Sequence, residues 1–268
     1  MPSDDLLKRL EALNGGPLAA RPRFQASTPV PKRAIATSNH TVPPVRTRGN
    51  LEALLNLDAS SSNSVESHLE IVRPISAFLK GQDLLSSRVR TSLETRGFSG
   101  AVFLDLETLG LKNDPLFLVG LLVFSGDGVL QCRQQFARNL SEEPSIIRAC
   151  ASILKEGDLL ITFNGILFDV PFLRRRSAAH GIRFPRISNH HDVLAQSRIR
   201  LAGEVRDFRL KTLENHLCGR KRTGDIPGGE IPRVYSAFQR TGDGASIVRI
   251  LEHNALDLIT TADLFTRL

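Results

Sequence analysis

The chain has 268 residues, of which 41% are hydrophobic, so it can form one medium-sized domain with a sizeable core and additional extensions. Three cysteines without a Cys-x-x-Cys pair argue against a disulfide framework and a thiolate zinc site, and the lack of a membrane-spanning apolar stretch or a signal peptide predicts a soluble, cytoplasmic protein. The net charge of +7 favours a polyanionic partner.

Residues 1–65 are predicted to form a disordered basic tail. Residues 1–50 hold eight Lys and Arg against three Asp and Glu, so this segment carries most of the net charge. Leucines at positions 6, 7, 10 and 13 predict a short amphipathic helix over residues 4–13. The following Pro-, Ser- and Arg-rich sequence has too few apolar residues to fold alone. The tail is either a solvated linker or an arm that lies on nucleic-acid phosphates.

Residues 66–268 are predicted to form the compact domain, which begins between Ser67 and Gly100. Apolar runs predict strands at residues 101–106, 116–124, 129–136 and 159–163, and Gly-Asp-Gly at 126–128 predicts a hairpin turn. Helical periodicity is found at residues 142–155, 171–179, 192–200, 211–218, 231–239 and 247–264. This order of elements predicts an α/β fold with a mixed sheet flanked by helices.

The first candidate site residues are Asp105 and Glu107, at the end of a predicted buried strand. Alternate strand residues share one face, so the two carboxylates lie roughly 7 Å apart on the same side. Two like charges in such a place repel and resist desolvation, which is tolerable chiefly when cations neutralise them. The pair therefore indicates a divalent-metal site, and the alternative is a strand that runs into a polar loop.

Two further acidic segments lie downstream. Asp169 comes just before Pro171 at the start of a predicted helix, where it is a helix N-cap, a metal ligand or both. His253 and Asp257 are four residues apart and therefore share one face of the terminal helix. They form either an exposed ion pair or part of a metal site that includes Asp105 and Glu107.

Several ordered motifs resemble the bacterial YprB-type ribonuclease H-like domain, within the DEDD exonuclease group of the ribonuclease H-like superfamily. The similarity covers residues 97–268. It rests on FLDLETLGL at 103–111, TFNG at 162–165, FDVPF at 168–172, HDV at 191–193, LKTLE at 210–214, DIPG at 225–228 and HNALD at 253–257.

The resemblance implies a metal-dependent 3′→5′ exonuclease that hydrolyses phosphodiester bonds at DNA or RNA ends. It implies two Mg²⁺ or Mn²⁺ ions held by Asp105, Glu107, Asp169 and Asp257, and a general-base role for His253. Related enzymes place a base His five residues, or a Tyr four residues, before the last Asp, whereas His253 stands at the four-residue spacing. The alternative function is a nucleic-acid-binding module that keeps the fold but has little catalysis.

The resemblance and the positions of neighbouring residues also suggest substrate contacts. Thr108, Asn164, Phe168 and Asn254 flank the predicted ligands in the motifs. Basic residues that could bind phosphates without reading bases are Arg174, Arg175, Arg176, Arg198, Arg200, Arg206, Arg209, Lys211, Arg220, Lys221 and Arg222. Asp192 is a helix cap or a further carboxylate of the site, and Asp225 lies in a Gly- and Pro-rich loop that could cover it.

Overall fold

The structure is a computed structural model that describes residues 62–65, 68–79 and 83–268. The predicted helix at residues 4–13 and most of the predicted disordered tail lie outside these residues. Four residues that the predicted boundary assigns to the tail, Ser62–Val65, form strand β1 and pair with the next strand. The position of the boundary stays a prediction.

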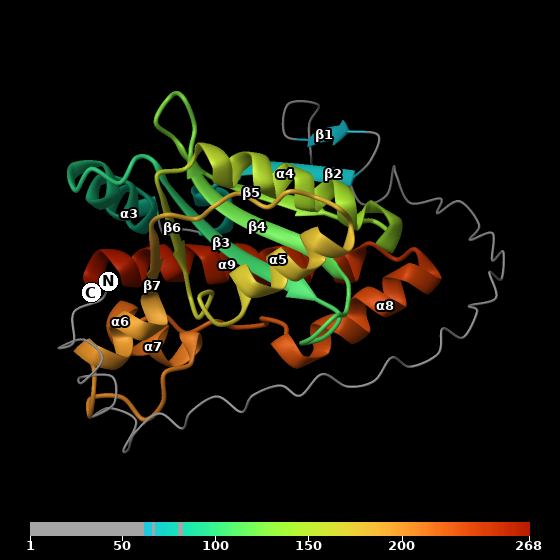
Figure 1. The fold of residues 1–268 in the computed structure, drawn as a ribbon. Helices are drawn as coiled ribbons and strands as arrows, with labels where there is room; N and C mark the ends of the chain where they lie inside the picture. The colour runs from blue at the N-terminus through green and yellow to red at the C-terminus, as the bar shows by residue number, and fades with distance from the viewer. Residues whose placement is uncertain (1–61, 66–67, 80–82) are drawn as a thin grey trace, which may run out of the picture. The chain divides into compact units, whose positions relative to one another are not determined.

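Within the described residues, seven strands form one mixed sheet (Figure 1). The strands are β1 (Ser62–Val65), β2 (His68–Pro74), β3 (Ala101–Thr108), β4 (Leu116–Phe124), β5 (Leu130–Phe136), β6 (Leu159–Thr162) and β7 (His190–Asp192). Their order across the sheet is β1-β2-β5-β4-β3-β6-β7. The pairs from β1 to β3 are antiparallel, whereas β6 and β7 add to β3 in parallel.

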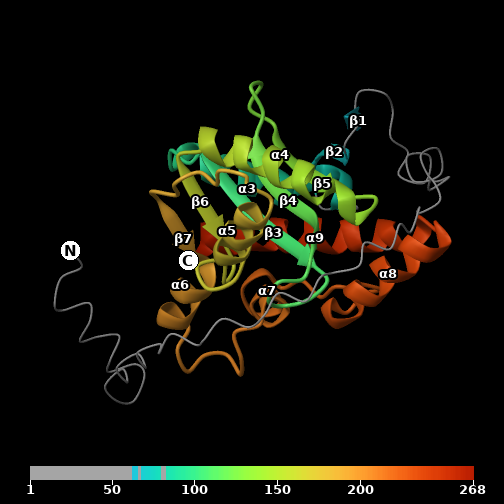
Figure 2. The ribbon, with the colours of Figure 1, turned by 45° about the vertical axis from the view of Figure 1, so that its right-hand side comes forward.

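Helices cover both faces of this sheet, as Figures 1 and 2 show. The helices are α3 (Asp83–Thr95), α4 (Glu143–Glu156), α5 (Asp169–Ala179), α6 (Val193–Arg200), α7 (Leu210–Cys218), α8 (Ile231–Thr241) and α9 (Ala245–Arg267), with short 3₁₀ turns at Ile75–Phe78, Leu140–Glu142 and Gly228–Glu230. Helices α4 and α5 pack against β3, β4 and β5 from one side. The long helix α9 crosses the same strands on the other side and contacts α7 and α8.

The alternation of side chains along β3 decides which way the candidate ligands point. Leu104 and Leu106 belong to the core cluster that contains α4 and α5, whereas Phe103 belongs to the cluster that contains α9 from Ala255 onward. Asp105 and Glu107 have the same parity as Phe103 and therefore face α9. Strand β4 is apolar throughout and buried on both faces, so it anchors the centre of the sheet.

The predicted mixed sheet flanked by helices is confirmed, as are all four predicted strands and all six predicted helices to within a few residues. The predicted turn is also present, with Gly128 at φ +77° and its amide bonded to the Ser125 carbonyl. Strand β2, helix α3 and strand β7 were not predicted. No helix in the described part of the chain is long and apolar enough to cross a membrane.

Candidate metal centre

Asp105 and Glu107 lie where β3 begins to leave the sheet. The β3–β4 register shifts between Glu107 and Thr108, so β3 is irregular directly after the second carboxylate. Both side chains are half-buried, and β3 ends at Thr108 before a loop in which residues 111–114 are exposed, so the strand does run into a polar loop after the two carboxylates. Thr108 turns back, and its hydroxyl donates to the Gly110 carbonyl at 2.8 Å.

A buried amide on α9 holds Asp105 in place. Asn254 is fully buried, and its Nδ2 donates to Asp105 Oδ2 at 2.8 Å while its Oδ1 accepts from Gln134 Nε2 at 2.9 Å. Gly120 lies opposite Asp105 on β4, and a Cβ at this position would come within 2.0 Å of the Asn254 Oδ1. The absence of a side chain at Gly120 is therefore what lets α9 approach the sheet and reach the carboxylate.

Ionisation of the two carboxyl groups on β3 is strongly unfavourable without a nearby cation. Burial, followed by repulsion from neighbouring carboxylates, raises the pKa of Asp105 well above its usual range. The same causes raise the pKa of Glu107. The neighbouring charges that raise these two pKa values include those of Asp169 and Asp257, so the other two predicted ligands lie near the pair on β3.

Asp169 is the first residue of α5, and it does not cap the helix. The N-cap position is Phe168, and no side-chain capping bond is present there. Asp169 is only 5% exposed, and burial raises its pKa to about 7, against the effect of hydrogen bonds from its own amide and the Leu106 amide. The N-cap interpretation is therefore wrong, and the burial of this acid has to be explained in another way.

The turn before Asp169 is fixed by Asp192. The Asp192 carboxylate accepts from the amides of Asn164 at 2.9 Å and Ile166 at 3.2 Å, and it also caps α6. Asn164 has a left-handed backbone with φ 69°, and Gly165 packs so closely on Thr162 that a Cβ would lie 2.4 Å from its hydroxyl. The cap role of Asp192 is confirmed. Its carboxylate also holds in place the turn that leads into Asp169.

On α9, His253 lies between two carboxylates. Its Nδ1 is 2.7 Å from Asp225 Oδ1, and its Nε2 is 3.5 Å from Asp257 Oδ2. The His253 side chain is only 8% exposed, so the alternative of an exposed pair is wrong. Hydrogen bonds from His253 and Lys211 outweigh burial and hold the pKa of Asp225 far below its usual range. Sequence reasoning placed Asp225 over the site but did not foresee this contact.

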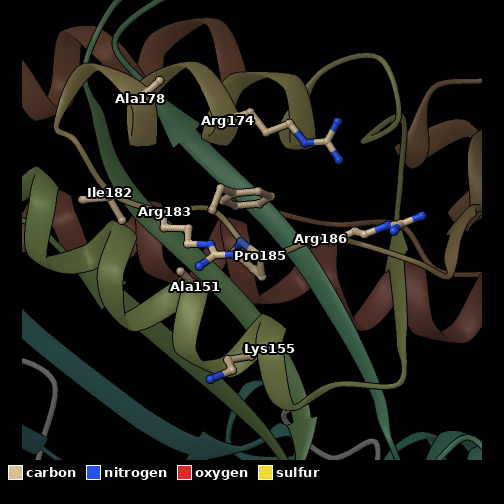
Figure 3. A pocket seen from close by; sticks show the side chains of 9 residues that line it. Ala151, Lys155, Arg174, Ala178, Ile182, Arg183, Pro185 and Arg186 are labelled. Carbon is tan, nitrogen blue, oxygen red and sulfur yellow. The ribbon is translucent and has the colours of Figure 1, made fainter.

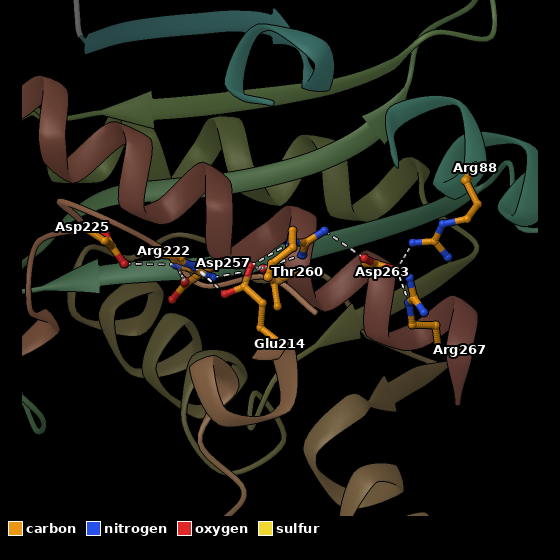
Figure 4. A network of polar contacts seen from close by, with 9 residues as sticks. Arg88, Glu214, Arg222, Asp225, Asp257, Thr260, Asp263 and Arg267 are labelled. Carbon is orange, nitrogen blue, oxygen red and sulfur yellow. Dashed lines mark hydrogen bonds and ion pairs between the residues drawn. The ribbon is translucent and has the colours of Figure 1, made fainter. Parts of the chain in front are cut away.

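Arg222 joins Asp257 to a larger network of ion pairs, shown in Figure 4. Its guanidinium bonds Asp257, Glu214 Oε2 at 2.7 Å and Thr260 Oγ1 at 3.0 Å. Arg220 forms ion pairs with Glu214 and with Asp263, which lies further along α9. Asp263 also forms ion pairs with Arg88 and Arg267. Arg220 and Arg222 were candidate phosphate contacts, but both are turned inward and paired.

The carboxylates fit a hard divalent cation in chemistry, although they do not form a closed ligand set. Among the residues that the structure describes, no three His, Cys, Asp or Glu side chains are gathered tightly enough to hold an ion. Asp257 forms an ion pair with Arg222. Four neighbouring carboxylates, three of them with raised pKa values, are nevertheless the oxygen ligands that Mg²⁺ and Mn²⁺ prefer.

The remaining predicted substrate contacts lie in different environments. Arg174 is exposed, Lys211 forms an ion pair with Asp225 at 2.8 Å, and Arg175 donates to the Lys112 carbonyl at 3.2 Å. Phe168 is half-buried against the core, with its ring centre 5.6 Å from that of Phe172. Asn254 is buried and bonded to Asp105, so it has no surface through which to touch a substrate in this conformation.

Comparison with known proteins gives a family and several relatives. A family model described as the RNase H superfamily matches residues 102–268. The uncharacterized protein YprB of Bacillus subtilis (strain 168) is 27% identical over 183 residues, which cover 65% of this chain and 43% of YprB. The chain thus spans less than half of that relative's length.

Two further proteins are similar to the chain. The uncharacterized protein MJ0365 of Methanocaldococcus jannaschii is 29% identical over 168 residues, covering 60% of this chain and 91% of that protein. Among solved structures, a family B DNA polymerase from Pyrobaculum calidifontis is 18% identical with a TM-score of 0.49, over 61% of this chain and 24% of the polymerase.

Proposed function

The chain belongs to the RNase H superfamily, in a YprB-type ribonuclease H-like family, and from this premise we propose that it is a divalent-metal-dependent nuclease. The proposed reaction is hydrolysis of phosphodiester bonds in DNA or RNA, from the 3′ end. The observation that carries the proposal is that Asp169 and Asp257 lie near Asp105 and Glu107, whose pKa values burial and these neighbouring charges raise. Such an arrangement is unstable alone and becomes favourable around cations.

Asp105, Glu107, Asp169 and Asp257 are the residues that would hold two Mg²⁺ or Mn²⁺ ions. When bound, such ions lower the pKa of a water molecule and neutralise charge on the scissile phosphate. Asn254 positions Asp105 through its 2.8 Å hydrogen bond. Asp192 fixes the turn that leads to Asp169. Both contacts are of the supporting kind that orients ligands before an ion arrives.

His253 is the proposed general base, and Asp225 is its orienting partner. Asp225 accepts a hydrogen bond from His253 Nδ1 at 2.7 Å, which fixes the tautomer and leaves Nε2 directed toward Asp257. A base held by a third group in this way is suited to take a proton from water next to the carboxylates. Lys211, which also pairs with Asp225, would then help to hold the dyad and would not contact substrate.

The ion pair between Arg222 and Asp257 supports a second candidate function. An arginine bonded to one of the predicted metal ligands is expected in a protein that binds nucleic acid but cleaves it little or not at all. In the nuclease proposal, the same pair is a contact that a divalent ion replaces. The two functions differ in whether Asp257 leaves Arg222 when metal is added.

The experiment that tests the proposed function uses labelled linear and circular DNA and RNA, incubated with Mg²⁺, Mn²⁺ or chelator. The nuclease proposal expects shortening of linear substrates from the 3′ end, no product in chelator and intact circles. Asp105→Asn keeps the shape of the side chain and removes its charge, so it should abolish cleavage while the fold is retained. Full activity of that variant would reject the carboxylate assignment, and binding of all substrates without cleavage would favour the second candidate.

A further inference from the structure

A concave surface that none of the four predicted metal ligands lines is found between α4, α5 and the segment that follows α5. The cavity has a volume of about 940 Å³ and is lined by Ala151, Lys155, Arg174, Ala178, Ile182, Arg183, Phe184, Pro185 and Arg186. Figure 3 shows the four basic side chains around it. We call it the basic groove.

The four cations of the basic groove have no partners within the described residues. Lys155, Arg174, Arg183 and Arg186 are all exposed, and their side chains take part in no hydrogen bond or ion pair there. None of the described residues that line the cavity is acidic. Four unpaired positive charges on one concave surface create a potential that attracts anions.

A neighbouring arginine shows that pairing is available on the same helix. Arg176 follows Arg174 by two residues on α5, yet its guanidinium bonds Glu143, and its Nη1 donates to the Asn113 carbonyl at 2.9 Å. Asp158 lies in a smaller adjoining hollow of about 190 Å³, which it shares with Lys155 and Arg186. The Asp158 carboxylate would repel an anion and therefore limits the extent of the basic groove on that side.

The floor of the basic groove is apolar. Ile182, Phe184 and Pro185 line it from the segment after α5, and Ala151 and Ala178 line it from the two helices. A row of cations beside an aromatic and apolar floor is the combination that binds single-stranded nucleic acid, because phosphates meet the charges and bases pack on the ring. A duplex would keep its bases stacked inside and could use only the cations.

We propose that the basic groove binds a single-stranded segment of nucleic acid, with its phosphates on Lys155, Arg174, Arg183 and Arg186 and a base on Phe184. The proposal deepens the proposed nuclease function, on which its link to cleavage rests. Helix α5 connects the two places, since it begins at Asp169 and carries Arg174 five residues later, a rise of about 7.5 Å. Phosphates a few nucleotides from the reacting one would therefore reach the groove.

Binding measured in chelator tests the groove independently of cleavage. The probe is a fluorescent single-stranded oligonucleotide, and its anisotropy is measured at several salt concentrations. The groove variant changes Lys155, Arg174, Arg183 and Arg186 to Gln. The control variant changes four exposed arginines elsewhere to Gln, Arg90, Arg233, Arg240 and Arg249, and so removes the same charge.

We expect the groove variant to lower the slope of log affinity against log salt by about 0.7 for each phosphate that it no longer binds, and the control variant to change it far less. Equal slopes for the two variants would overturn the proposal, because the loss of binding would then depend only on net charge and not on the groove. If the wild-type protein binds in chelator through the groove but never cleaves, the groove proposal stands and the nuclease proposal fails.

The choice of a single strand is tested at Phe184. Phe184→Leu keeps an apolar side chain in this half-buried position but removes the ring, and circular dichroism and a melting curve verify that it folds. Loss of stacking should weaken single-strand binding by about 5- to 150-fold and leave binding of a duplex of the same length unchanged. Equal loss on both probes, or loss on neither, would contradict base stacking in the groove.

Discussion

Two basic regions of this molecule use the same residue type in opposite ways. Around α9, Arg88, Arg220, Arg222 and Arg267 are each paired with Glu214, Asp257 or Asp263. In the basic groove, the cations face a cavity that no described acid lines. Neither a count of arginines nor their order along the chain therefore identifies phosphate contacts. What matters is whether the fold has already given each guanidinium a carboxylate.

The pairing also predicts different responses to substitution. A buried charge that loses its partner is strongly destabilising, whereas an exposed charge can be removed at little cost. Changes near α9 should therefore alter stability or catalysis, and changes in the groove should alter only binding.

The largest effect is expected at His253. If it takes a proton from the attacking water, His253→Ala should slow cleavage by about 10²–10⁴-fold and remove the acid limb of the pH–rate profile, with little change in metal affinity. Asp225→Asn should slow cleavage in the same direction, because it weakens the orientation of the ring. Single-turnover rates measured across pH test this. A variant with most of the wild-type rate and an unaltered pH profile would reject the base role.

The next effect separates the two regions directly. Arg222→Met removes the arginine bonded to Asp257 and one of the two arginines bonded to Glu214, so it should lower the free energy of unfolding in chelator by about 3–5 kcal/mol. Arg186→Met in the basic groove should change it by less than about 0.5 kcal/mol. Urea denaturation measures both. Adding Mn²⁺ should recover part of the loss in Arg222→Met, and equal stabilities of the two variants would contradict the comparison.

A smaller loss is expected where the sheet meets α9. Gly120→Ala places a methyl group against Asn254, which should destabilise the fold by about 1–3 kcal/mol and displace the amide that positions Asp105. Metal affinity should fall by about 10–100-fold, as for other changes to groups that orient a ligand. Isothermal titration with Mn²⁺ measures this, and Gly157→Ala, which meets Val102 and not a site residue, is the matched control. Equal affinities of the two variants would contradict the positioning role of Asn254.

The smallest effect concerns the tail. Deleting residues 1–61 keeps β1 in the chain and removes the basic N-terminal sequence. If the tail binds phosphates, the slope of log affinity against log salt on duplex DNA should fall by about 0.9 for each phosphate that the tail neutralises. An unchanged slope would identify the tail as a passive linker and leave the basic groove as the principal cationic surface.

Local sequence patterns predicted the central fold well. The apolar runs at β3 and β4 and the periodicity of α9 are strong because these elements are buried over most of their length. Strand β7 has only three residues and two histidines, so no apolar pattern marks it. Helix α3 has only a narrow apolar stripe of Leu85, Val89 and Leu93 at four-residue spacing among many polar residues.

The candidate site was only partly predictable, because its supporting contacts are long-range. The motifs place Asp105 and Asn254 in the site, but not the hydrogen bond between them, which spans 149 positions in the sequence. The roles of Gly120 and Arg222 also depend on how α9 packs on the sheet and on the loop after α7. Asp225 was visible in a Gly- and Pro-rich loop, yet nothing local showed that it would meet His253.

The most direct test of the central claim is divalent-metal binding by the wild-type protein, measured by isothermal titration with Mn²⁺ in the absence of nucleic acid. We expect saturable binding of two ions by the wild-type protein and none by Asp105→Asn. Affinity should increase as the pH rises through about 7, because burial raises the pKa of Asp169 to that value and protons compete with the ion below it. Absence of saturable binding, or equal binding by Asp105→Asn, would contradict the assignment of the carboxylates.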